Sequence, residues 1–290
     1  MKTRLLAPRI LTMNRTLYWM ATAALSLGVT VAHASEPGAG QASLSTGFDY
    51  SSGKYGLDTN TDIWSVPVTL GYMADRWSFK LTVPYINVSG PSNVIPGIGV
   101  VDSGNPSGRG RGRGASTGTV SPGTMVTNGS ASGMGDIIAS AGYAIVQSTD
   151  RSFGIDLTGR VKFGTADADK GLGTGKNDYG LTVDTHKSFD NWTVFGGIGW
   201  TKYGSSPYIQ LKNGVNANVG ASYKIDRQNS IGAYYYYHQK LVEGGASQSE
   251  VAAFWNHRIS SALRLQVYAL GGFADGSPDY GAGASIRYMF

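Results

Sequence analysis

The last nine residues of the chain, Ala282–Phe290, alternate strictly between two kinds of side chain. One parity is apolar or aromatic: Ala282, Ala284, Ile286, Tyr288 and Phe290. The other parity is small or polar and includes Arg287. Because successive side chains of a strand point to opposite faces, this pattern predicts a strand with one apolar face. Such a strand suits the wall of a transmembrane β-barrel, in which one face contacts lipid.

The same alternation recurs along most of the chain after residue 41. It predicts twelve strands, an even number, over residues 44–50, 64–72, 77–85, 137–145, 153–163, 179–186, 192–200, 215–223, 231–237, 251–255, 263–269 and 282–290. Helical periodicity is absent outside the N-terminal region. The predicted fold class is therefore all-β, a transmembrane antiparallel up-and-down β-barrel of about twelve strands.

The connections between these strands alternate in length. Short turns are expected at 75–76, 148–151, 190–191, 226–229 and 260–261, and longer loops at 53–60, 89–132, 164–177, 204–212, 242–247 and 274–279. A bacterial barrel has short periplasmic turns and longer extracellular loops. The segment 89–132 is the longest of these loops, and we expect it to be extracellular.

The N-terminus has the pattern of a secretion signal peptide over residues 1–34. Four basic residues precede or border an apolar run, and Ala32-His33-Ala34 resembles a cleavage site. The start could be either Met1 or Met13. Of 24 basic and 19 acidic residues, the leader holds four basic ones, so residues 35–290 carry a net charge of about +1. This balance gives no support to a nucleic-acid partner. We expect residues 35–290 to form the barrel.

The parity opposite the apolar one should line the barrel interior, because charges are costly on the lipid face. Asp49 belongs to this set, and the lumen-lining candidates are Lys80, Asp156, Arg160, Lys162, Asp184, His186, Lys224, Arg264 and Arg287. Two roles are open for them. They could form ion-pair ladders that fill a narrow barrel, or they could line a solute path with a mildly cationic constriction.

The long loop contains three regularly spaced arginines, Arg109, Arg111 and Arg113. RNA-binding segments use similar repeats, but an extracellular loop makes that use improbable. The loop could contact lipopolysaccharide phosphates, fold into the barrel mouth as a gate, or remain solvated.

Neither catalysis nor a cofactor is expected. His186, His238 and His257 have no nucleophile motif beside them, and we interpret them as structural or interfacial. The chain has no cysteine, which excludes disulfides and thiolate metal sites. We expect no metal ion.

Several segments resemble a set of proteobacterial outer-membrane proteins known as "transporter" or "meta-pathway of phenol degradation" proteins. They include Ser52–Gly56, Trp64–Thr69, Phe79–Tyr85 and Val94–Gly97. The most specific is Ala166–Tyr179, which reads ADADKGLGTGKNDY. The resemblance implies a monomeric barrel that passes hydrophobic or aromatic molecules.

The predicted function is an outer-membrane channel for passive uptake of small solutes, including aromatic or hydrophobic ones, in a Gram-negative bacterium. The alternative is a structural or surface-binding barrel without an open pore. Expected partners are outer-membrane lipid, lipopolysaccharide, the solute and the barrel-assembly machinery. Tyr288 and Phe290 resemble the signal by which that machinery recognises barrels.

Overall fold

The computed structural model describes residues 15–17, 30–32, 40–101, 128–205 and 209–290. The wall strands, in chain order, are β3 (Gln41–Gly53), β4 (Thr61–Ala74), β5 (Trp77–Pro91), β8 (Asn128–Met134), β9 (Ile137–Gln147), β10 (Phe153–Phe163), β11 (Asp178–Phe189), β12 (Trp192–Lys202), β13 (Gly214–Lys224), β14 (Asn229–His238), β15 (Gln248–Arg258), β16 (Leu263–Gly272) and β17 (Tyr280–Met289). Two short strand pairs are not part of the wall: β1 (Arg15–Leu17) pairs with β2 (Thr30–Ala32), and β6 (Val94–Ile95) with β7 (Gly99–Val100).

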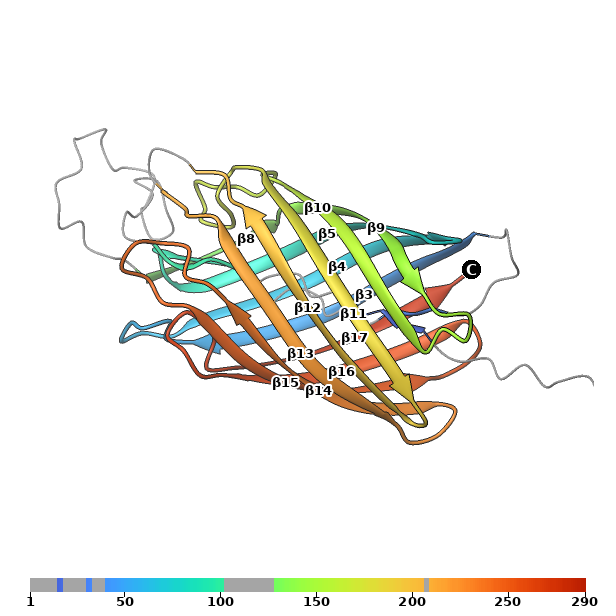
Figure 1. Ribbon diagram of the computed structural model, residues 1–290. Coiled ribbons are helices and arrows are strands. Elements are labelled where there is room, and N and C mark those ends of the chain that lie inside the picture. The colour runs from blue at the N-terminus through green and yellow to red at the C-terminus, as the bar shows by residue number, and fades with distance from the viewer. Residues whose placement is uncertain (1–14, 18–29, 33–39, 102–127, 206–208) are drawn as a thin grey trace, which may run out of the picture.

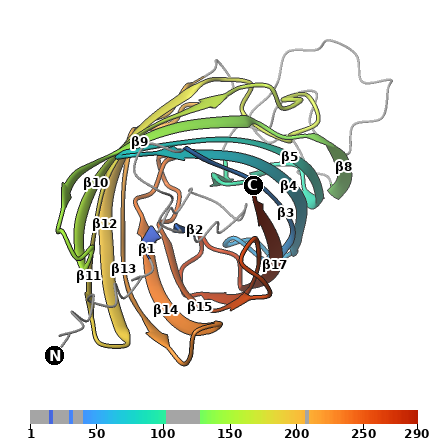
Figure 2. The ribbon, with the colours of Figure 1, turned by 90° about the vertical axis from the view of Figure 1, so that its right-hand side faces the viewer.

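The wall strands form one closed antiparallel ring, seen along its axis in Figure 2. β5 pairs with β8 and then with β9, which follow one another and together make one wall strand, so the wall has twelve strands. The last strand closes the ring by pairing with β3, from Tyr280↔Ser52 to Met289↔Ser43. The predicted fold class and strand number are confirmed. No helix in the described residues is long and apolar enough to cross a membrane.

All tight turns lie at one end of the barrel, together with the start of β3 and the end of β17 (Figure 1). Two of them contain only two residues between strands, and each begins with an aspartate in the left-handed region, Asp75 and Asp190, both at φ 51°. Aspartate tolerates this conformation better than most residues. The longer loops lie at the opposite end, as the alternation of connection lengths predicts.

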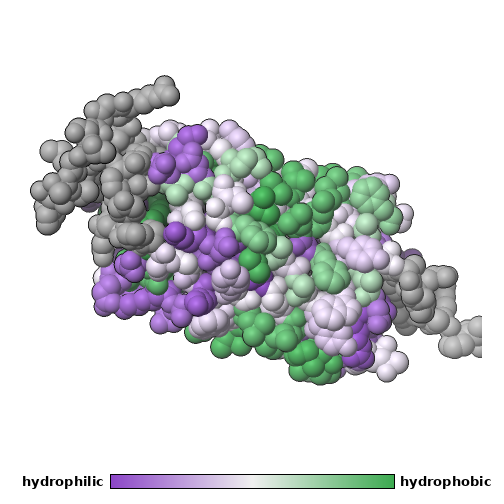
Figure 3. Space-filling view, turned by 90° about the horizontal axis from the view of Figure 1, so that it is seen from above, coloured by the Kyte–Doolittle hydropathy of each residue, from purple (hydrophilic) through white to green (hydrophobic). Residues whose placement is uncertain are grey.

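The outer face is apolar over the wall, and Figure 3 shows this surface with a hydrophilic region toward the long-loop end. Leu70, Ile198 and Val219 are each more than half exposed, as a lipid-facing surface requires and a soluble one does not. Aromatic rings gather near the two ends of the strands. Trp77 lies 4.8 Å from Tyr143 near the tight turns, and Trp64 lies 6.0 Å from Tyr85 near the long loops, measured between ring centroids. These groups correspond to the two girdles of a membrane barrel.

The predicted loop 89–132 is too long at both ends. Strand pairing of β5 with β8 runs from Tyr85↔Met134 to Pro91↔Asn128. The β6–β7 hairpin occupies part of the remaining loop. Arg109, Arg111 and Arg113 lie outside the described residues, as does most of the predicted signal peptide 1–34.

Inward-facing glycines leave space for aromatic rings of neighbouring strands. A Cβ on Gly232 of β14 would lie 2.4 Å from Cζ of Phe254, and one on Gly220 of β13 would lie 2.4 Å from Cζ of Phe195. A ring that lies over a glycine fills the gap its missing side chain leaves in the wall. Gly159 of β10 differs, since a Cβ there would meet nothing within 4 Å.

We expect Gly232→Ala to destabilise the folded barrel by about 1–3 kcal/mol, because Phe254 has to leave its place. Gly159→Ala is the matched control and should be neutral or stabilise slightly, since alanine restricts the unfolded chain. Urea titration of the folded band on a semi-native gel, with barrels in lipid vesicles, measures both. Equal midpoints for the two variants would contradict the packing described.

Candidate functional site

The nine predicted lumen-lining residues share the inner parity of their strands, opposite the exposed apolar side chains. Asp156, Asp184 and His186 are buried. The half-buried ones are Lys80, Arg160, Lys162, Arg264 and Arg287, whereas Lys224 is exposed at the tight-turn end of β13. The structure therefore distributes this set along the whole interior and brings only some members together.

Charges of like sign are neighbours in the lower lumen, toward the tight turns. Asp156 of β10 is the register partner of Asp184 of β11, and Arg264 of β16 is that of Arg287 of β17. Lys80 of β5 interacts electrostatically with both Asp184 and Arg287. The lower lumen thus carries carboxylates on one part of the wall and guanidinium groups on another, with Lys80 between them.

A pocket of about 60 Å³ lies at this end between β13 and β17. Its polar lining includes Lys224, Arg227, Arg258, Arg264 and Arg287, and Asp226 is the one acidic lining residue.

Five aromatic side chains gather on the inner face at mid-height. The set of lumen-lining residues that the sequence predicts from its charges does not include them. They are Phe195, Tyr234, Tyr236, Phe254 and Tyr268, all less than a tenth exposed, and Ala252 packs with them. The sequence does contain one indication of inward-facing aromatic residues, the Tyr234–Tyr237 run, because consecutive tyrosines in a strand must face both sides of the wall.

Asp49 joins this cluster to the opposite side of the closing seam. Its carboxylate accepts a hydrogen bond of 2.7 Å from the Tyr268 hydroxyl and one of 3.5 Å from the Ser65 hydroxyl. These contacts connect β16, β3 and β4 through the interior.

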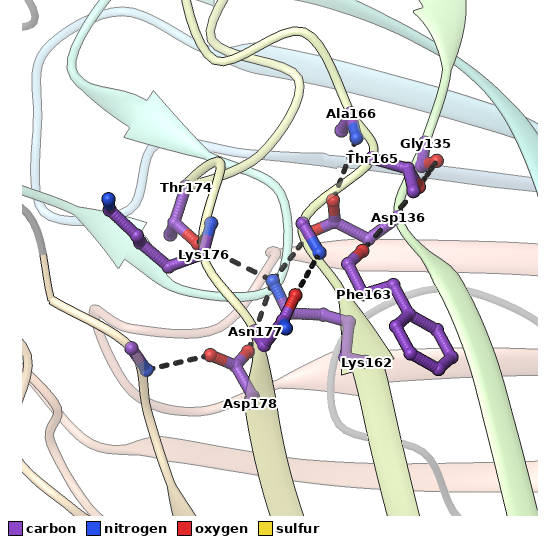
Figure 4. Close-up of polar contacts among 12 residues, drawn as sticks. Gly135, Asp136, Lys162, Phe163, Thr165, Ala166, Thr174, Lys176, Asn177 and Asp178 are labelled. Carbon is purple, nitrogen blue, oxygen red and sulfur yellow. Dashed lines mark hydrogen bonds and ion pairs between the residues drawn. The ribbon is translucent and has the colours of Figure 1, made fainter.

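The upper lumen, toward the long loops, is organised around Lys162 (Figure 4). Its Nζ lies 2.5 Å from Asp136 Oδ2 and 3.1 Å from Asp178 Oδ2, and all three side chains are mostly buried. Asp136 lies in the break between β8 and β9, where an extra residue in the strand turns its side chain inward. Asp136 Oδ1 also accepts a hydrogen bond from Ala166 N, and Asp178 accepts one from Gly204 N. The ion-pair cluster therefore fixes two loops to the wall.

The loop 164–177 folds inward rather than away from the barrel. Ala166 and Leu172 pack with Ile63, Ile86 and Val88 of β4 and β5. Its glycines Gly171 and Gly175 have φ of 67° and 65°, a conformation that other residues adopt at a cost. This requirement explains part of the ADADKGLGTGKNDY pattern.

Three loops make an apolar cluster over the long-loop mouth, here called the apolar cap. It consists of Ile95, Val101, Tyr203, Ile209, Leu241 and Val242, all buried. The Tyr203 hydroxyl hydrogen-bonds His238 Nε2 at 3.0 Å beneath the cap, and an ion pair of Lys212 with Glu243 joins two of the loops.

Below the cap lies a second pocket of about 60 Å³ with two kinds of wall. One is apolar, with Ile86, Ile95, Ile98 and Leu172, and the other carries Arg160, Lys162, Asp136 and Asp178. A molecule in this space would contact both apolar and charged groups.

The histidines do not assemble a catalytic group among the described residues. His238 contacts Tyr203, and His257 Nδ1 lies 2.8 Å from Asn229 Oδ1. In the same part of the chain, no group of three or more His, Cys, Asp or Glu side chains is arranged to hold a metal ion.

Lys162→Met should destabilise the barrel by about 2–4 kcal/mol, because Asp136 and Asp178 would keep buried negative charges without their cation. The control is Lys170→Met, which removes a partner of Asp167 at an exposed pair and should cost less than about 0.5 kcal/mol. Urea midpoints in lipid vesicles measure both costs, and limited proteolysis should show faster cleavage within 164–177 only for Lys162→Met. Unchanged stability of that variant would refute the anchoring role.

Comparisons with known proteins agree with this architecture. The COG4313 outer membrane channel from Pseudomonas putida F1 superposes with a TM-score of 0.61 at 12% identity, covering 89% of this chain and 100% of that one. The NanC porin gives a TM-score of 0.51 at 9% identity, covering 84% and 98%. No curated protein matches the chain in sequence. Residues 34–290 match the family described as "Putative MetA-pathway of phenol degradation", and the chain belongs to that family.

Proposed function

We propose that this barrel is a passive channel of the Gram-negative outer membrane for small solutes. The observation that carries the proposal is the interior, where two pockets of about 60 Å³ each lie at opposite ends of one closed ring of strands. Several charged side chains line each of these spaces, which suits a water-filled path better than a packed core, because charges are costly to bury away from water. Twelve strands enclose a lumen much narrower than that of a 16-stranded porin, so only small molecules can pass.

The solute class that we propose is small molecules with an aromatic or hydrophobic body. The upper cavity presents an apolar wall, and the inner face at mid-height carries the aromatic cluster. Apolar linings with a few placed polar groups are typical of sites for such ligands. The family description refers to phenol degradation, which supports the same class.

Transport rather than catalysis is part of the proposal. His238 and His257 are engaged by Tyr203 and Asn229, and neither of those partners is a nucleophile paired with a base. A structural or surface-binding barrel is the competing function, and one observation favours it: the apolar cap joins three loops to one another at the long-loop end.

Planar-bilayer recording should decide between these functions. We expect discrete current steps from the purified barrel, and uptake into liposomes of phenols and aromatic acids in preference to sugars of similar size. If neither the full chain nor a variant lacking residues 102–127 gives current steps, the barrel has no open pore and the competing function is correct. The double variant Ile95→Ala/Leu241→Ala in the same recording should increase conductance if the apolar cap restricts the mouth.

We also propose that Tyr288 and Phe290 are read by the barrel-assembly machinery. Their rings face outward, 48% and 72% exposed, with centroids 5.0 Å apart. They lie at the closing strand, where a monomeric barrel must complete its ring, and the outer face around them would contact lipid. Lipopolysaccharide would contact the outer face toward the long loops.

Phe290→Ala should lower the amount of folded barrel in the outer membrane severalfold without changing the stability of the barrel that does fold. Phe273→Ala is the control, because Phe273 is 73% exposed but follows β16 at the long-loop end. Quantitative blotting of outer-membrane fractions measures the effect. An equal loss for the two variants would indicate a general effect of aromatic anchoring instead of recognition.

A further inference from the structure

A groove of about 750 Å³ lies on the outer face of the wall, where β4, β5, β9, β10 and β11 run side by side. Most of the residues that line it have the outward parity of their strands and apolar side chains. Clefts that receive a whole small-molecule ligand measure about 300–1,000 Å³. The groove is therefore large enough to hold part of another molecule.

The floor of the groove consists of residues with little or no side chain. Ala139 and Ala141 of β9 point outward, and Gly159 of β10 is the register partner of Ala141. A Cβ on Gly159 would meet nothing within 4 Å, so the space above it is open. Larger outward rings flank this floor, with Phe79 of β5 on one side and Tyr179 of β11 on the other. In a membrane, a flexible hydrocarbon chain can fill such a hollow and make the contacts that the small residues leave unmade.

Two exposed lysines lie beside the end of the groove at Tyr179. Lys202 of β12 is the register partner of Tyr179 and shares its outward parity, so the two lie about 4.5–5.5 Å apart at Cβ. Lys176 approaches the same place, because a Cβ on Gly204, two residues after Lys202, would lie 2.6 Å from Lys176 Cβ. The apolar groove thus ends at a pair of cations.

These two lysines differ from others at the long-loop end in having no acidic partner. Lys212, in the next loop along the chain, is paired with Glu243. Within the part of the chain that the structure describes, no carboxylate lies within ion-pair distance of Lys176 or Lys202. The longer loops of an outer-membrane barrel face the cell exterior, so both lysines lie at the level of the outer leaflet.

We propose that the groove and the two lysines form one binding site for lipopolysaccharide. An acyl chain of its lipid A lies over Ala139, Ala141 and Gly159, and a phosphate lies at Lys176 and Lys202. Phosphate oxygens accept strong, charge-assisted hydrogen bonds from ammonium groups. The inference goes beyond the channel function, because the site is outside the lumen and would serve a barrel with or without an open pore.

The position of the lysines favours this lipid over a second copy of the chain. Two barrels packed groove to groove would be related by a two-fold axis along the membrane normal, as in most homodimers. Lys202 of both copies would then lie at the same height in one interface, where like charges repel. A phosphate instead neutralises the charge of Lys202 and of Lys176 while the acyl chain fills the groove.

Native mass spectrometry of the folded barrel in detergent, titrated with lipid A and separately with phosphatidylglycerol, tests the charged part of the site. We expect one bound lipid A per barrel and weaker binding of phosphatidylglycerol. Lys176→Gln/Lys202→Gln should weaken lipid A binding about threefold to tenfold, as the loss of two exposed ion pairs implies. The matched control is Lys54→Gln/Lys240→Gln, which removes two exposed lysines from other long loops and should leave the affinity unchanged.

The apolar part of the site is tested by filling the groove. Ala141→Leu/Gly159→Leu should weaken lipid A binding severalfold, because two larger side chains would occupy the place of the acyl chain. The control is Ala233→Leu/Ala253→Leu, which enlarges two outward register partners on β14 and β15, away from the groove. This control should bind lipid A as the unaltered barrel does.

Heat-modifiable migration on a denaturing gel checks that each variant folds. Monophosphoryl lipid A on the unaltered barrel provides a test that needs no variant, and it should bind more weakly than the form with two phosphates. Equal affinity for phosphatidylglycerol and lipid A, dimers in place of lipid complexes, or equal losses in the variants and their controls would overturn the inference. Because lipid binding is measured without current, a barrel that gives no current steps would overturn the channel function alone.

Discussion

Backbone hydrogen bonding in lipid is the constraint on which the rest of this structure depends. A strand in the membrane has no water to satisfy its amide and carbonyl groups, so every strand needs a partner on both sides. The β17–β3 seam meets that requirement for the first and last wall strands. Once the ring is closed, the period of two in each strand assigns every side chain either to lipid or to the lumen.

This period explains which features could be predicted from the sequence. The twelve strands and the inward parity of the charged residues follow from alternation alone, because charges are excluded from the lipid face. The aromatic cluster does not follow in the same way. Phe195 and Phe254 are apolar residues on the inner face, where they are tolerated because glycines on adjacent strands make room for them.

The Lys162 cluster could not be predicted from the sequence, because it depends on tertiary contacts between different strands. Asp136 belongs to no periodic segment, and only the break between β8 and β9 turns it toward Lys162. Asp178 begins β11, the strand that follows β10, and it reaches the ammonium group of Lys162 only because β10 and β11 are paired in that register. Loop folding likewise depends on contacts between segments far apart in the chain, such as Leu172 with Ile86.

The anchoring by Lys162 has a consequence for how the mouth of the barrel can change shape. The loop 164–177 is held to the wall by Asp136 through Ala166, and the start of the following loop by Asp178 through Gly204. The segment around Ile95 packs in the apolar cap through apolar contacts, which have no fixed direction and re-form easily after sliding. One side of the mouth, which includes the loop 164–177, is therefore fixed to the wall, whereas the segment around Ile95 can slide. A solute that enters would displace the segment around Ile95 relative to the fixed side.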